Sequence, residues 1–218
     1  MVKKIPEKSK FEFLDVRLGI RLKYLVPILN FGEFATWLVG AGFKIQQTAN
    51  VLDNFQGQKG SVDIYLDGNK GVFGVHAASI ETAITTTREM IAIISKNYTS
   101  IESRIYFYEF DVTANYYYGA DVYAKFATLF QDSKDIELIN EVLGGGYSQG
   151  DIHFMPTGKN IDSSSWYELR IDPKFNSLGD MLIIKMICRD EDLTKAASMA
   201  RAAQEKAEKI IQRVLTKR

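Results

Sequence analysis

Apolar and polar residues alternate along several segments of this chain, most clearly in residues 11–23, FEFLDVRLGIRLK. The apolar face of this segment is formed by Leu14, Val16, Leu18, Ile20 and Leu22. A period of two with one apolar face is typical of a strand that is half buried in a sheet. Residues 61–67 and 71–76 alternate in the same way around the turn signal at 67–69, which predicts a hairpin.

Helical spacing follows each of these strand patterns. Asn30 can cap a helix that ends at Gly40 and Gly42, because Asn is a preferred N-cap and Gly a common helix terminator. Ser79 can cap a longer helix. Its buried stripe would be formed by Ile80, Ala83, Ile84, Thr87, Ile91 and Ile94.

The second half of the chain repeats this order of elements. Residues 104–114 predict a strand whose helix-covered face carries Tyr106, Tyr108, Phe110, Val112 and Ala114. The later elements predicted are helices at 119–130 and 136–143, a glycine-rich turn at 144–146, a strand at 150–155, a hairpin of 166–172 and 180–188, and one long helix at 190–215.

These patterns predict an α+β protein with a tandem pseudo-repeat of strand, helix, hairpin and long helix. The strands would form one mostly antiparallel sheet with helices on one face. The boundaries expected are a flexible N-terminal segment at 1–10, a first repeat at 11–100 and a second repeat at 101–218, packed as one compact unit. The 46% of apolar residues suffices for such a core and excludes a disordered chain.

The order of elements resembles the fold of the TATA-box-binding proteins, a tandem duplication that forms a saddle. The resemblance is closest at 16–22 and from 64–68 through 77–79. It implies a saddle that binds nucleic acid. The family's intercalating phenylalanine would fall on Tyr65 in the first half and near Arg170 in the second, and Arg170 cannot separate bases in the same way. Function does not follow from fold alone.

Charge and composition restrict the partners. The chain has 27 basic and 27 acidic residues, so no overall positive field attracts nucleic acid or an anionic membrane. No apolar stretch is long enough to span a bilayer, and the first ten residues are too polar for a signal peptide. We therefore expect a cytoplasmic protein that binds no membrane.

Few residues suggest catalysis or a bound metal. The two histidines are His76 and His153, and a metal site would need a third ligand that no motif supplies. We expect His76 to hydrogen-bond backbone and Cys188 to be a small buried thiol. No catalytic signature and no phosphate-binding motif occurs, so the sequence favours a protein without cofactor or enzymatic activity.

The sheet face opposite the helices carries the candidate binding residues. Alternation assigns to this open face Asp15, Arg17, Arg21, Asp63, Tyr65, Glu109, Asp111, Trp166, Glu168 and Arg170. One interpretation is a solvated face with cross-strand ion pairs. The other is a recognition surface, because mixed charges interleaved with aromatic rings suit a protein partner or a polar ligand.

Three functions follow from this face. The first hypothesis is a non-catalytic binding or interaction protein, which includes a homodimer joined through the sheet face or a sheet edge. The second is a nucleic-acid-binding saddle that uses Arg17, Arg21, Lys23 and Arg170, although Asp15, Glu109, Asp111 and Glu168 on the same face would repel phosphate. The third is a metal-dependent enzyme that uses paired carboxylates such as Glu109 and Asp111.

Overall fold

The computed structural model describes residues 11–23, 30–48, 53–119, 121–129, 134–143, 150–174 and 179–215. The strands in these ranges form one antiparallel sheet of nine strands, in the order β2-β3-β4-β5-β1-β6-β9-β8-β7. Their bounds are β1 Phe11–Leu22, β2 Lys44–Gln47, β3 Asn54–Lys59, β4 Val62–Asp67, β5 Val72–Ala77, β6 Ile105–Tyr117, β7 Ile152–Phe154, β8 Trp166–Pro173 and β9 Met181–Asp190. The predicted α+β class with one antiparallel sheet is confirmed. The segment 1–10 and the turn at 144–146 lie outside the described residues.

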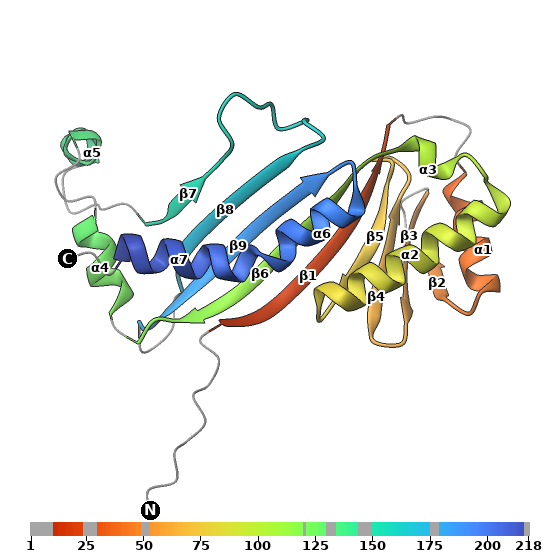
Figure 1. Cartoon of the computed structure of the whole chain (residues 1–218), viewed down its shortest axis with the longest axis horizontal. Coiled ribbons are helices and arrows are strands. Elements are labelled where there is room, and N and C mark those ends of the chain that lie inside the picture. The colour runs from red at the N-terminus through yellow and green to blue at the C-terminus, as the bar shows by residue number, and fades with distance from the viewer. Residues whose placement is uncertain are drawn as a thin grey trace, which may run out of the picture.

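The long helices lie across one face of this sheet (Figure 1). Helices α1 (Phe31–Gly40) and α2 (Ile80–Asn97) pack against the first-half strands, and α6 (Leu193–Arg201) packs against β6 and β9. The other helices are α3 (Ile101–Arg104), α4 (Val122–Leu129), α5 (Lys134–Leu143) and α7 (Ala203–Leu215). The sheet residues beneath the helices are almost fully buried and include Leu18, Ile20, Val75, Phe110, Val112, Ile184 and Met186. The opposite sheet face is therefore the open one.

The predicted helix caps are present. The Asn30 side chain accepts hydrogen bonds from the backbone N–H groups of Gly32 at 2.9 Å and Glu33 at 3.3 Å. The Ser79 hydroxyl accepts one from the N–H of Thr82 at 3.2 Å. The prediction of one long last helix is wrong in one detail, because α6 and α7 are separated at Ala202. After the break, α7 contacts α4 and also places Lys206 over the ring of Tyr167 on β8.

Two β-bulges in the pairing of β1 with β6 change the predicted faces. The register shifts between Phe13 and Asp15, so Leu14 leaves the buried face and is 48% exposed. It shifts again where Leu22 pairs with Ile105 and Arg21 with Phe107, and the extra residue is Tyr106. Tyr106 therefore lines the open face and not the helix-covered core, where we predicted it. A bulge rotates one side chain without altering the sequence pattern, so alternation could not reveal it.

Strands β1 and β6 form the centre of the sheet and connect its two halves. The first half continues outward through β5, β4, β3 and β2, and the second through β9, β8 and β7. Both halves therefore share one sheet. No helix in the described part of the chain combines the length and apolar character needed to cross a membrane.

Candidate functional site

All of the predicted site residues lie on the open face, because the strand register aligns them in rows. One row runs across β4, β5, β1 and β6 through Asp63, His76, Arg17 and Asp111. The next row runs through Tyr65, Gly74, Gly19, Glu109, Arg189 and Trp166. Asp15, Arg21, Glu168 and Arg170 occupy alternate positions of β1 and β8 on the same face.

A groove of about 1670 Å³ lies over the part of this face that β4, β5, β1 and β6 form. The predicted residues that line it are Arg17, Arg21, Asp63, Tyr65, Glu109 and Asp111. One wall is formed by Lys44, Gln46, Gln56 and Gln58 of β2 and β3, and another by Ile161 and Asp162 from the connection between β7 and β8. The groove does not reach Trp166, Glu168 or Arg170, so the structure divides the predicted site in two.

A pair of glycines determines how Tyr65 lies in the groove. A Cβ atom on Gly19 would be 2.8 Å from the Tyr65 hydroxyl, and one on Gly74 would be 2.6 Å from it. The phenol therefore occupies the space that two side chains would otherwise fill. Burial raises the pKa of Tyr65 to about 12, with a further contribution from Glu109 that Arg17 opposes. Tyr65 thus presents a neutral hydroxyl at neutral pH.

His76 bridges two carboxylates and does not play the backbone-binding role that we expected. Its Nε2 contacts Asp15, and its Nδ1 lies 3.8 Å from Asp63. Asp15 also pairs with Arg17 at 3.1 Å. The register explains this cluster, because His76 is the cross-strand neighbour of both Asp63 and Arg17.

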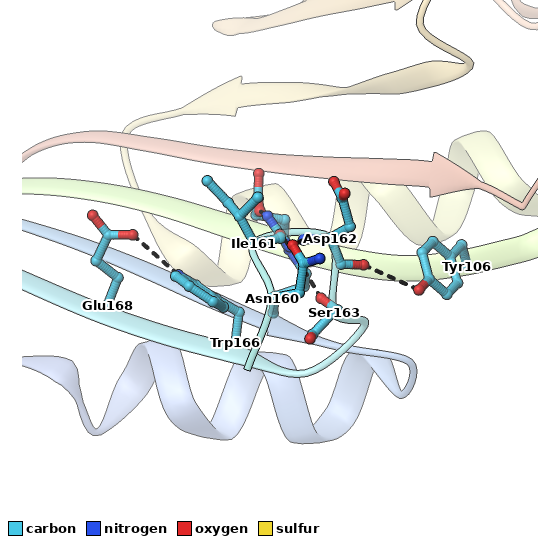
Figure 2. A network of polar contacts seen from close by, with 9 residues as sticks. Tyr106, Asn160, Ile161, Asp162, Ser163, Trp166 and Glu168 are labelled. Carbon is cyan, nitrogen blue, oxygen red and sulfur yellow. Dashed lines mark hydrogen bonds and ion pairs between the residues drawn. The ribbon is translucent and has the colours of Figure 1, made fainter. Parts of the chain in front are cut away.

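Arg189 holds one wall of the groove in place. Its Nε donates to Glu109 at 2.7 Å, and its Nη1 donates to the carbonyls of Ile161 at 2.6 Å and Ser163 at 3.0 Å. Its guanidinium also stacks 4.2 Å from the centroid of the Phe107 ring. The Tyr106 hydroxyl donates to the carbonyl of Asp162 at 3.0 Å (Figure 2). We call residues 160–163 the strap, since these contacts fasten them over the open face.

The part of the open face in the second half is internally paired. Arg170 contacts Asp172 at 2.9 Å and Asp151 at 3.0 Å, and His153 contacts Glu168 at 2.7 Å. The Trp166 indole donates to Glu168 at 3.0 Å (Figure 2) and is only 5% exposed. Trp166 is therefore not the exposed aromatic that we expected, and these side chains have little capacity left for a ligand.

The groove, by contrast, contains charges without a partner. Among the described residues, the side chains of Arg21 and Asp111 form no hydrogen bond and no ion pair, and the same holds for the side chain of Lys44. Burial raises the pKa of Asp111 above its ordinary value, because Arg17 and Lys185 only partly offset the effect of burial while Asp15 and Glu109 add to it. A half-buried carboxylate in this setting would be stabilised by a cationic group from a ligand.

Side chains that could bind a metal do not converge in the described part of the chain. No group of three or more His, Cys, Asp or Glu side chains there could hold a metal ion. Glu109 is already paired with Arg189. Cys188 is fully buried beneath the helices, and burial raises the pKa of its thiol to about 12, which leaves it protonated.

Several residues of the site were not foreseen from the sequence. Arg189 follows a strand whose last predicted residue, Cys188, points inward, so alternation would have placed Arg189 on the open face. The pairing of Gly19 with Gly74 and the position of the strap depend on contacts between distant segments. No motif in the sequence signals them.

Neither the known protein-family models nor the curated protein sequences contain a match to this chain. Its function is therefore inferred from the site itself.

Proposed function

We propose that this chain is a non-catalytic binding protein that holds its ligand in the groove on the open face of the sheet. The observation that carries the proposal is the presence of unpaired charges in the groove. Arg21 and Asp111 line a large concave surface without partners of their own among the described residues. Concave sites with a few convergent polar groups are the usual location of ligands.

The contrast with the second half supports binding over a merely solvated face. There, Arg170 pairs with Asp151 and Asp172, and His153 pairs with Glu168, as the solvated interpretation predicts. If the groove were only a solvated surface, a carboxylate would be expected opposite Arg21 as well. The residue opposite Arg21 on β6 is instead Phe107. Aromatic rings beside a free cation are typical of recognition surfaces.

Thermal unfolding in the presence of a ligand panel tests this proposal. The panel contains short synthetic peptides of different charge, mononucleotides, oligonucleotides and small carboxylic acids and amines. A ligand of the groove should raise the midpoint of unfolding, since binding to the folded state alone stabilises it. The effect should disappear in Gln56→Trp, which fills the groove from the exposed side of β3, and persist in Arg88→Glu, an exposed position on α2. Binding that survives Gln56→Trp would contradict the proposal.

Nucleic acid is the second candidate, because Arg17, Arg21, Lys23 and Lys44 line the groove. Asp63, Glu109 and Asp111 line it as well and would repel phosphate. We therefore expect no submicromolar binding of duplex DNA at physiological salt. A salt titration of binding distinguishes nucleic acid from other ligands of the groove, since phosphate contacts produce a steep dependence on salt concentration.

The tandem duplication and the saddle-like fold remain part of this proposal. They are supported by the order of strands, which runs outward from the central pair β1–β6 in both halves. The predicted homodimer would use a sheet edge, where Phe154 of β7 is 45% exposed and Met155 beside it 61% exposed. Light scattering of the intact chain and of Met155→Lys tests this contact. A cytoplasmic location also remains a prediction.

A further inference from the structure

The two unpaired charges of the groove have opposite signs and a defined spacing. Asp111 on β6 is the cross-strand partner of Arg17 on β1, and Arg21 follows Arg17 by four residues on the same strand. At the rise of an extended strand, the backbone positions of Asp111 and Arg21 are therefore about 13 Å apart along the strand direction, on neighbouring strands. Both side chains line the same groove and point away from the helices.

The surface between these two charges is neutral. Glu109 lies between them on β6, but Arg189 compensates its charge. Tyr65 covers Gly19 and Gly74, and its raised pKa keeps the hydroxyl protonated. A complementary ligand therefore has a cationic group at the Asp111 end, an anionic group at the Arg21 end, and an uncharged section between.

The dimensions of the groove favour a chain segment over a small zwitterion. Its volume of about 1670 Å³ exceeds the roughly 300–1,000 Å³ of pockets for drug-sized molecules. The wall formed by β2 and β3 presents the exposed side-chain amides of Gln46 and Gln56. An amide side chain offers both donors and acceptors, which match the N–H and C=O groups of a peptide backbone.

We propose that the groove binds an extended peptide segment of a partner protein, with a basic side chain against Asp111 and an acidic side chain against Arg21, at positions i and i+4 of that segment. In an extended chain, residues i and i+4 point to the same side and lie about 13 Å apart. The spacing of the peptide charges thus equals the spacing of the groove charges. This inference rests on the proposed binding function of the groove.

Fluorescence anisotropy with labelled synthetic peptides tests the spacing on the unmodified chain. The probes are Lys-x-x-x-Glu and Lys-x-x-Glu peptides in the same background of Ser, Thr and Ala. The i, i+4 peptide should bind about tenfold more tightly, because the i, i+3 arrangement turns one charge away from the groove and loses one ion pair and its hydrogen bond. Peptides of both chain directions are included, since the groove charges do not fix the direction.

Charge-reversal variants test which residues read the peptide. Arg21→Glu should shift the preference from Lys-x-x-x-Glu to Lys-x-x-x-Lys, and Asp111→Lys should shift it to Glu-x-x-x-Glu. The matched controls are Arg88→Glu on α2 and Glu141→Lys on α5, which are exposed outside the groove and should leave the preference unchanged. A shift of preference cannot result from partial unfolding, which would weaken all peptides alike.

The outcomes separate this inference from the proposed function. Equal binding of the two spacings overturns the inference, and so does an Arg21→Glu protein that keeps the original preference. If a variant does not fold, the spacing series on the unmodified chain still decides. Binding of some other probe that Gln56→Trp abolishes would leave the groove as a binding site but refute the peptide. If no probe binds, both proposals fail.

Discussion

Replacing Arg189 with Met should remove the contacts that fasten the strap while keeping most of the packing of the side-chain stem. Arg189 donates to Glu109 and to the carbonyls of Ile161 and Ser163, and its side chain is only 11% exposed. Each charge-assisted hydrogen bond contributes about 1.5 kcal/mol or more. The loss would also leave Glu109, 31% exposed, without its cation.

Breaking a fully buried ion pair costs roughly 3–5 kcal/mol of unfolding free energy. Because Glu109 remains partly solvated, we expect a loss at the lower end of this range, about 3 kcal/mol. Urea denaturation followed by circular dichroism measures it. Trypsin should also cleave after Lys159 faster in this variant, because Lys159 adjoins the released strap and its own hydrogen bonds are to the nearby Ser165. Cleavage is measured under native conditions on the intact chain.

Arg170→Met is the matched control, since Arg170 forms two ion pairs on the same face but its side chain is 46% exposed. Exposed ion pairs contribute little, so the control should lose less than about 1 kcal/mol. The reasoning is refuted if Arg189→Met costs no more than Arg170→Met, or if cleavage at Lys159 is unchanged. Either result would mean that the strap is held by something other than Arg189.

Three further predictions concern residues of the sheet. Gly19→Ala should destabilise the protein by about 1 kcal/mol, because the added Cβ would meet the Tyr65 hydroxyl, and adding Tyr65→Phe should restore most of this stability. Tyr65→Phe should not rescue Gly74→Ala, because the Cβ at position 74 would also lie 2.3 Å from the carbonyl oxygen of Leu18. Asp111→Asn should raise the unfolding free energy at pH 7, and the difference in stability from the unmodified chain should vanish in acid. The reason is that the pKa of Asp111 is raised in the folded state, so the carboxyl favours folding when protonated and opposes it once the pH rises through that pKa. Cys188 should resist a thiol reagent in the native protein and react after unfolding, because burial raises its pKa to about 12.

Each of these predictions has a result that would contradict it. Equal rescue of both glycine variants by Tyr65→Phe would show that the clash with the backbone is not decisive at Gly74. A pH-independent difference between Asp111→Asn and the unmodified chain would show that the carboxyl does not titrate differently in the folded state. Rapid native labelling of Cys188 would show that the helices do not protect β9.

The sequence predicted the strands and helices well where one face of an element is buried. The alternation in β1 and β6 assigned the buried positions from Val16 to Leu22 and from Phe110 to Ala114 correctly. It failed at Leu14 and Tyr106, where a bulge rotates the chain. A bulge arises from the fit of two paired strands, so the pattern within one strand carries no sign of it.

For the candidate site, the sequence identified the open face but not which of its residues line the groove and which are paired outside it. It placed Tyr65 and Trp166 on that face as equivalent aromatics, whereas Tyr65 lines the groove and Trp166 is buried beside Glu168. It also treated Arg21 and Arg170 alike, although Arg170 is paired with Asp151 and Asp172 and Arg21 is not paired among the described residues. The partners of a surface charge belong to neighbouring strands, and their register is not written in either strand alone.

By itself, the sequence determined the fold class, the faces of the strands and the helix caps, because these depend on periodicity and on residues a few positions apart. Only the tertiary structure decided which charges remain unpaired, where the strap lies, and that His76 joins two carboxylates. Those features depend on which strands become neighbours and in what register. Burial of one apolar face determines that register, and the polar residues of the other face follow it passively.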